Sequence, residues 1–221
     1  MPKVLFLNDY PMQEARRLHA AGLYPSQHLW GTAELPALGW TVIDFPDRTW
    51  LGSPARLRFS IQQLQAAVLS FQHDVDVIYS ACQFNTWLLA RLRRLGLLNA
   101  PLVTMVHHPL RGPLQNLSYV RGHDTLLFLN RAVEEQSRRR FGSDLPPTRA
   151  LHWGPDLDFA SDVSPQGPLV DVIAAGKSHR DFPTLIQAAQ GASWTAAVYC
   201  ARRNVETVAT VPPNVTVTAR S

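Results

Sequence analysis

The residues best suited to chemistry stand together after Gly176. Lys177 and Arg180 follow this glycine closely, and Asp181 with Pro183 has the form of a helix start. A helix N-terminus presents free N–H groups and about half a positive charge, so the two cations and the helix end could together hold a diphosphate. A structural alternative is that Arg180 and Asp181 only cap the helix and pair with each other.

The Gly-Lys-Ser sequence at positions 176–178 resembles the end of a P-loop. That motif needs a glycine five residues before its Gly-Lys pair, and Asp171 occupies this position inside a predicted strand. The sequence therefore argues against a P-loop. A dinucleotide-binding fingerprint is absent too, because no G-x-G-x-x-G follows the first apolar run at Asn8.

Two adjacent histidines, His107 and His108, stand at the end of a strongly apolar run. Neighbouring side chains on a strand point to opposite sides, so we expect only one of them, His107, to face a site. The alternative is that His107 is an ordinary hydrogen-bonded residue at a strand end. Neither histidine belongs to an H-E-x-x-H motif or has a third ligand at a recognisable spacing, and Cys82 and Cys200 form no CxxC pair. The sequence therefore predicts neither a metal site nor a disulfide scaffold.

Short apolar runs alternate along the chain with segments of helical spacing, which is typical of an α/β fold with a mainly parallel sheet. Six runs are predicted as strands of a first, Rossmann-like domain: residues 4–8, 40–45, 76–80, 102–107, 125–130 and 149–152. Helices are predicted at 54–73, 84–95 and 131–141, the last ended by Gly142. The first of these helices repeats apolar residues at three- and four-residue steps, namely Leu57, Ile61, Leu64, Val68 and Phe71.

Turn-forming residues dominate positions 154–168, and this composition predicts a linker. After it the alternation restarts, with strands at 169–175, 194–199 and 215–218 and a helix from Asp181 to Gly191. Three strands are too few to bury a sheet on both faces. We therefore predict an N-terminal Rossmann-like domain at 1–153, a linker at 154–168 and an incomplete second Rossmann-like domain at 169–221. This second unit either packs on the first sheet or begins a larger domain.

The composition bounds these interpretations. Of 221 residues, 46% are hydrophobic and 17% charged, against roughly 25% charged in an average globular chain, so the chain folds. No apolar segment approaches the ~20 residues that span a bilayer, and the N-terminus turns polar too soon for a signal peptide, so we expect a cytoplasmic protein. The net charge is +4, and only Lys3 and Lys177 are lysines. Arginine matches phosphate with a planar fork, which favours anionic partners; the alternative is a genome-wide bias in composition.

Four segments, taken together, resemble glycosyltransferase family 4, the retaining class with two Rossmann-like domains (GT-B). They cover residues 102–108, 124–136, 151–159 and 176–186. The resemblance implies a nucleotide-sugar donor as substrate, no cofactor, no metal requirement and retention of the anomeric configuration. It places Gly176, Lys177 and Arg180 at the donor phosphates and His107 near the sugar and the reaction centre. Cations held there would stabilise the charge that builds on a departing diphosphate.

Two features depart from the family pattern. Gly22 lies seventeen residues before Gly39, where the family carries the first residue of a Gly-Gly turn, but Leu23 replaces the second glycine. Because Gly22 matches the first glycine of that turn, it is a candidate for contact with an acceptor. The family's two glutamates, eight positions apart, would fall beyond Ser221, so we expect this chain to be an N-terminal portion of the enzyme.

The resemblance predicts a hexosyltransferase-type enzyme that moves a sugar from a nucleotide-sugar to an acceptor: a saccharide, a lipid-linked molecule or a small molecule. A second hypothesis is a non-catalytic binding or scaffold module whose short second unit only covers the first sheet. A third is a small-ligand sensor related to flavodoxin-like folds, which needs acidic residues at the ends of strands one and three. Asp9 fits that pattern, whereas Ser80, Ala81 and Cys82 do not.

Two arginine clusters offer a surface for an anionic partner: Arg91 with Arg93 and Arg94, and the run 138–140. The family resemblance favours a peripheral membrane contact, to which such residues add roughly 1 kcal/mol each. The alternative is a solvated helix face. No nucleic-acid partner is predicted, because no helix-turn-helix, zinc-finger or ribonucleoprotein motif accompanies the arginines.

Overall fold

A computed structural model describes residues 1–8, 12–44, 55–151, 153–161, 169–176, 180–204 and 210–220 of the chain. Contacts between residues divide the chain into two units, Met1–Val163 and Ser164–Ser221. We describe each unit by itself. The predicted α/β fold with parallel, Rossmann-like sheets is confirmed.

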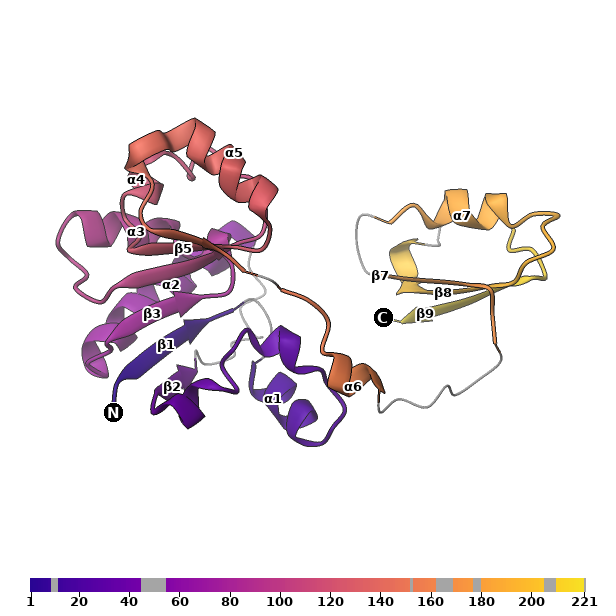
Figure 1. The fold of residues 1–221 in the computed structure, drawn as a ribbon, viewed down its shortest axis with the longest axis horizontal. Coiled ribbons are helices and arrows are strands. Elements are labelled where there is room, and N and C mark those ends of the chain that lie inside the picture. Colours follow the sequence, from indigo (N-terminus) through magenta and orange to yellow (C-terminus); the bar gives the residue numbers. More distant parts are fainter. Residues whose placement is uncertain are drawn as a thin grey trace. The chain divides into compact units, whose positions relative to one another are not determined.

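Unit 1 is built on a six-stranded sheet in the order β2-β1-β3-β4-β5-β6, with every neighbouring pair parallel (Figure 1). The strands are β1 (Lys3–Leu7), β2 (Thr41–Asp44), β3 (Val77–Ser80), β4 (Leu102–Val106), β5 (Thr125–Phe128) and β6 (Thr148–Ala150). Each predicted run in this part of the sequence overlaps one of them. Because all strands run the same way, their carboxyl ends meet at one edge of the sheet.

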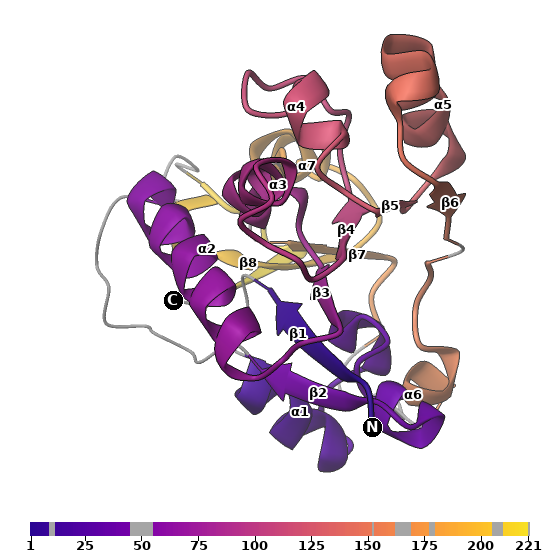
Figure 2. The ribbon, with the colours of Figure 1, turned by 90° about the vertical axis from the view of Figure 1, so that its left-hand side faces the viewer.

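Helices cover both faces of this sheet, as parallel sheets require. The α-helices are α1 (Met12–Ala20), α2 (Ala55–Gln72), α3 (Trp87–Arg94), α4 (Leu117–Val120), α5 (Arg131–Phe141) and α6 (Leu157–Ser161). Short 3₁₀ turns follow at η1 (Ser26–Leu29), η2 (Leu35–Leu38), η3 (Gln83–Asn85) and η4 (Gly142–Asp144). Helices α2 and α3 lie on one face of the sheet and α1 lies on the other (Figure 2). On β1, Leu5 packs with α2 and α3 in one core, whereas Phe6 packs with α1 in a second core.

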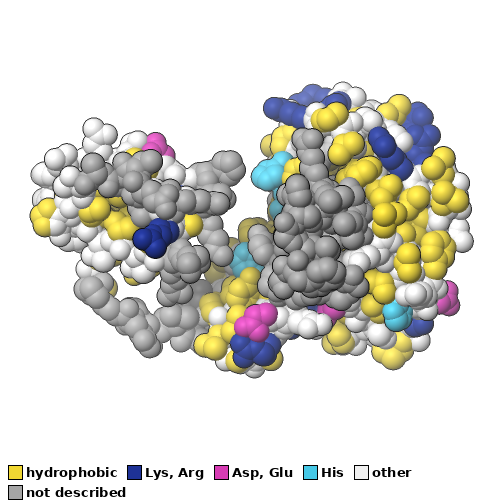
Figure 3. Space-filling model, turned by 180° about the vertical axis from the view of Figure 1, so that it is seen from behind, with side chains coloured by type: hydrophobic (Ala, Val, Ile, Leu, Met, Phe, Trp, Pro, Cys, Tyr) yellow, Lys and Arg dark blue, Asp and Glu magenta, His cyan; other side chains and the backbone are white. Residues whose placement is uncertain are grey.

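Helix α2 forms where the sequence predicts it, but it buries a different face. Leu64, Val68 and Phe71, which the spacing assigns to an apolar face, are 53%, 53% and 59% exposed. The residues packed inward are small or polar ones: Gln63, Ala66, Ala67 and Ser70. The alanines let the helix approach the sheet closely, and the Gln63 side chain accepts hydrogen bonds from the backbone N–H groups that begin α3. Figure 3 shows exposed hydrophobic side chains on one face of unit 1.

Unit 2 has a three-stranded parallel sheet in the order β7-β8-β9, made by β7 (Val172–Gly176), β8 (Ala196–Ala201) and β9 (Val215–Arg220). Helix α7 (Phe182–Ala188) packs against one face through Phe182 and Ile186, and the turn η5 (Arg202–Asn204) follows β8. On the other face, Ile173 is 69% and Tyr199 48% exposed. The described residues of unit 2 therefore cover one face of the sheet and leave the other open.

Candidate functional site

A histidine turn follows β4 at the carboxyl edge of the unit 1 sheet. His107 and His108 each donate a backbone N–H to Oε1 of Gln83, at 2.8 and 2.9 Å. The Gln83 amide donates in return to the His108 carbonyl at 3.1 Å, and its side chain is buried. Ligands of open parallel sheets bind outside the carboxyl ends of the strands, so this turn stands in a position suited to a binding site.

The ring of His107 is half-buried, and its Nε2 atom lies 2.5 Å from the carbonyl oxygen of Ala81. A carbonyl only accepts, so Nε2 carries the proton in this contact. The bond fits an ordinary strand-end histidine, and it equally fixes the ring for a role in a site. Because β4 ends at Val106, strand alternation does not separate the two histidines. Their ring centroids lie 6.3 Å apart, so the expectation that they point to opposite sides is wrong.

Around His107 lies an aromatic cluster that local sequence patterns do not reveal. It consists of Tyr24, His28, Trp30, His107 and Trp153. Trp30 and Trp153 stack with centroids 5.6 Å apart and planes 16° apart, and Trp30 meets His107 edge-on at 5.1 Å. His28 lies 5.6 Å from Tyr24 and 6.1 Å from Trp153. The signal in the sequence is only that Trp153 belongs to a segment carrying the family resemblance; its contact with Trp30 is long-range.

Asp156 fastens the segment after β6 to the turn that carries the cluster. Its carboxylate accepts the backbone N–H of Ser26 at 2.8 Å and that of Phe159 at 3.0 Å, while its own N–H donates to the side chain of Gln27. These bonds, first that from Phe159 and then those from Ser26, lower the pKa of Asp156 to about 2. The 24–30 turn and the 153–159 segment therefore form one connected rim within unit 1.

Gly22 has a structural role that needs no ligand. Its φ of +70° is left-handed, and its N–H bonds the carbonyl of His19 at 2.9 Å while Leu23 N–H bonds Leu18 at 2.8 Å. This is the Schellman pattern that ends a helix, here α1, and a glycine is the residue best suited to it. The structure therefore explains the glycine by the backbone, and a contact with an acceptor stays a prediction.

In unit 2 the structure brings together two of the predicted phosphate-binding residues. Gly176 is the last residue of β7, and a Cβ atom placed on it would lie 2.8 Å from Nε and 2.9 Å from Cγ of Arg180. The arginine side chain therefore passes directly over the glycine. Any other residue at position 176 would place its Cβ atom in the space that this side chain occupies. Lys177 lies outside the described residues.

Asp181 caps α7, as the sequence predicts. Its carboxylate accepts the backbone N–H of Thr184 at 3.1 Å and the Thr184 hydroxyl at 2.7 Å. The hydroxyl, followed by the backbone N–H, lowers the pKa of the Asp181 carboxyl. The ion pair between Arg180 and Asp181 that the structural alternative invokes is not among the ion pairs of the described residues. Arg180 is exposed.

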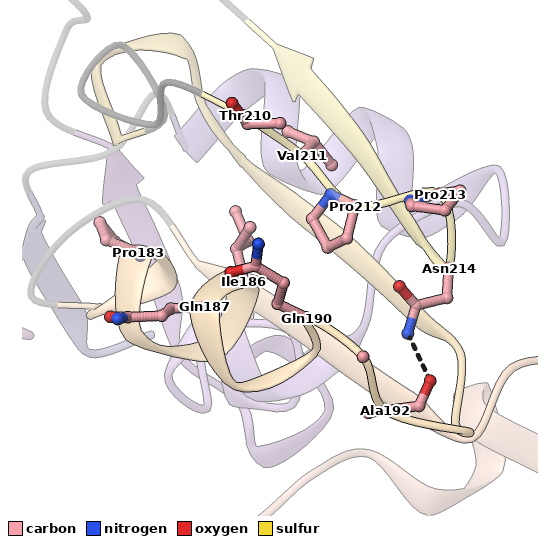
Figure 4. Close-up of a pocket in the computed structure, with 11 residues that line it drawn as sticks. Pro183, Ile186, Gln187, Gln190, Ala192, Thr210, Val211, Pro212, Pro213 and Asn214 are labelled. Carbon is pink, nitrogen blue, oxygen red and sulfur yellow. Dashed lines mark hydrogen bonds between the residues drawn. The ribbon is translucent and has the colours of Figure 1, made fainter.

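A cavity of about 790 Å³ lies elsewhere in unit 2, between α7 and the residues before β9 (Figure 4). Pro183, Gln187 and Gln190 line one side of it. Asn214 stands at its floor, where its amide donates to the carbonyls of Ala189, Ala192 and Trp194. This cavity runs along α7 from Pro183 to the residues before β9, and neither Gly176 nor Arg180 lines it.

Among the described residues, no three His, Cys, Asp or Glu side chains approach closely enough to share a metal ion. Within the same residues, no helix combines the length and the apolar character needed to cross a bilayer.

Both units have a Rossmann-like α/β fold, and the fold class of the chain is GT-B-like. Similar solved structures include MurG from Acinetobacter baumannii (12% identity, TM-score 0.53) and sucrose-phosphate synthase from Thermosynechococcus elongatus (14%, 0.67). Both matches cover 100% of this chain, and they cover 66% and 71% of the MurG and synthase chains. The glycosyltransferase SnogD from Streptomyces nogalater matches over 100% of this chain and 73% of its own at 16% identity, with a TM-score of 0.38.

At these identities the likeness shows the fold alone. The chain spans about two thirds of the length of the MurG structure it matches. No protein-family model matches the sequence, and no curated protein is similar to it.

Proposed function

We propose that the chain is part of a glycosyltransferase that moves a sugar from a nucleotide-sugar to an acceptor with retention of configuration. In this proposal unit 2 binds the donor and unit 1 the acceptor. The observation that carries it is the Arg180 side chain lying over Gly176 at the carboxyl end of β7, in a chain whose fold is that of GT-B enzymes.

The chemistry asks for cations at the donor phosphates. When the bond to the sugar breaks, negative charge builds on the departing diphosphate, and groups already in place stabilise it more than they stabilise the bound donor. The guanidinium of Arg180 offers a planar pair of donors to phosphate oxygens. In this proposal Lys177 supplies a second cation, and no metal takes part.

His107 is assigned to the sugar and the reacting carbon. Its backbone is held by Gln83 and its ring by the Ala81 carbonyl, so the imidazole has a defined position without a ligand. Such pre-positioning is what a group facing a transition state needs, because no ordering remains to be done when the substrate binds.

Calorimetric titration with UDP, GDP, ADP and CDP tests the donor assignment. We expect at least one nucleoside diphosphate to bind the chain, and Arg180→Ala to weaken it by about tenfold or more, the worth of one charge-assisted hydrogen bond. Arg149→Ala, which removes an exposed arginine on β6 of unit 1, is the matched control and should leave affinity unchanged. Absence of binding to every nucleotide, or equal binding by Arg180→Ala, contradicts the assignment of the donor phosphates to unit 2 of this chain.

A peripheral contact with anionic membrane belongs to the same proposal. Several cluster arginines are occupied within the protein: Arg93 bonds Asp124, Arg138 bonds Glu134 and Arg140 bonds the Leu110 carbonyl. The outer face of α2 is the stronger support, since its apolar side chains are exposed and α2 and α3 carry no acidic residue.

Vesicle co-sedimentation tests this contact. We expect the chain to sediment with vesicles containing phosphatidylglycerol and not with phosphatidylcholine alone. Phe71→Ser combined with Val68→Ser should reduce the bound fraction severalfold. Equal binding to both vesicles, or no effect of the double substitution, excludes a contact through this face.

A further inference from the structure

The Trp30–Trp153 pair is an unusual aromatic stack at the carboxyl edge of the unit 1 sheet. The two indoles come from segments more than a hundred residues apart and stack at 5.6 Å. Trp30 is only 9% exposed, whereas Trp153 is 43% exposed. Stacked and edge-on aromatic contacts are favourable, so the inner ring supports the outer one. The pair presents an indole to solvent from a fixed base.

Trp30 retains two unfavourable features. Its φ of +56° lies in the left-handed region, where a bulky residue is an outlier, and Gly31 continues the turn at +80°. Its indole Nε1 is buried, and it makes no hydrogen bond to any of the described residues. The Trp30 carbonyl accepts the Tyr79 hydroxyl at 3.0 Å, which holds the residue in this conformation. Such features persist where the surrounding structure imposes them, and they gather at ligand sites.

The surroundings of the pair favour a neutral, ring-shaped ligand. His107 meets the edge of Trp30 at 5.1 Å and His28 lies 6.1 Å from Trp153, so an imidazole flanks each indole of the pair. The Asp156 carboxylate is fixed in the same rim, held on the amides of Ser26 and Phe159. A carboxylate there disfavours an anionic ligand. An indole face offers the apolar C–H side of a sugar ring a flat partner, while imidazole and main-chain groups beside it can bond hydroxyls.

We propose that Trp153, backed by Trp30, is the stacking platform for a neutral saccharide. That this saccharide is the acceptor rests on the proposed function, whereas the stacking platform itself does not. Trp153 contacts the sugar, and Trp30 is a positioning residue that acts through it.

Titration of the chain with methyl β-glucoside and methyl β-galactoside tests the platform, followed by the indole N–H signals of its six tryptophans in nitrogen-15 NMR spectra. Sorbitol, a polyol without a ring, is the control ligand. We expect a glycoside to shift the Trp153 and Trp30 signals saturably, and sorbitol to shift neither. The Trp87→Phe variant, altered elsewhere in unit 1, should bind as the unaltered chain does.

Two substitutions at one position separate stacking from simple bulk. Trp153→Phe keeps an aromatic face and should bind the glycoside within about threefold of the unaltered chain, whereas Trp153→Leu keeps apolar volume and should lose about tenfold. Equal binding by the two variants overturns the proposal, and so does a chain that binds no glycoside. Retained signals for the other tryptophans show that each variant is folded.

Parallel titration with UDP separates this inference from the proposed function. Glycoside binding that depends on Trp153, without binding of any nucleoside diphosphate, leaves the platform standing while the transferase proposal fails. Nucleotide binding without glycoside binding gives the opposite result.

Discussion

The two units share a plan of parallel strands joined by helices, but they differ in how their sheets are covered. On β4 of unit 1, Leu102 faces one core and Met105 the other, and both are almost fully buried. On β7 of unit 2, Val172 and Ala174 pack toward α7, whereas Ile173 on the opposite face is 69% exposed. Buried side chains on both faces of the unit 1 sheet contribute to stability, whereas in unit 2 only those that face α7 do. The same kind of substitution should therefore have different consequences in the two units.

The largest expected effect is in the core of unit 1. Leu102→Ala and Met105→Ala should each lower the free energy of unfolding by about 2–5 kcal/mol, because each removes a buried side chain from one of the two cores. Ile173→Ala on the open face of unit 2 should change it by less than about 0.5 kcal/mol, as for other exposed positions. Urea unfolding measures all three. A large loss for Ile173→Ala would show that something covers this face in solution.

The next effect concerns pH and a histidine buried in unit 1. Burial lowers the pKa of His123 to about 4; its ring nitrogens bond the Tyr119 carbonyl at 2.8 Å and the Thr86 hydroxyl at 3.1 Å. In the unfolded chain a histidine binds its proton near pH 6.5, so the neutral ring stabilises the fold above that pH. This contribution is lost as the pH falls from about 6.5 to 4, by up to roughly 3 kcal/mol.

Chemical unfolding at a series of pH values measures this slope. His123→Gln should flatten it between pH 4 and 6.5, whatever its effect at pH 7. An unchanged slope in this variant would assign the pH dependence to other groups.

The smallest effect compares equivalent helix caps. Asn130 begins α5 by accepting the N–H of Val133 at 2.9 Å, and Asp181 begins α7 by accepting that of Thr184 at 3.1 Å. Replacing either by alanine should cost about 1 kcal/mol. Hydrogen exchange, measured for each unit as the temperature is raised, should show that each substitution lowers stability only in the unit that carries it. A loss shared by both units would mean that they unfold together.

Much of the fold follows from the sequence because short apolar runs bounded by turn residues encode buried strands. The predicted start at Leu169 is too early, since Leu169 is 91% exposed and β7 begins at Val172. Just before that strand, Asp171 accepts hydrogen bonds from Thr195 and ties this end of the sheet together. Strand ends depend on such contacts with distant residues, which spacing along the chain does not encode.

The inward face of α2 and the aromatic cluster could not be predicted for the same reason. Spacing favours Leu64 and Val68 as core residues, yet Gln63 turns inward because it caps α3, 25 residues further on. Trp30 takes a left-handed backbone conformation that sequence rules reserve for glycine and asparagine. Its stacking partner, Trp153, comes from the segment after β6, far away in the sequence. Gly176 and Arg180 were predictable as a pair because they are only four residues apart.

The buried amide of Gln83 separates the shape of the histidine turn from its chemistry. All the bonds it makes to residues 107 and 108 involve main-chain atoms, so it supports the same loop whichever side chains stand there. The two imidazole side chains can therefore be replaced without removing these hydrogen bonds to the main chain. A protein engineer could vary both positions to alter ligand preference without rebuilding the backbone beneath them.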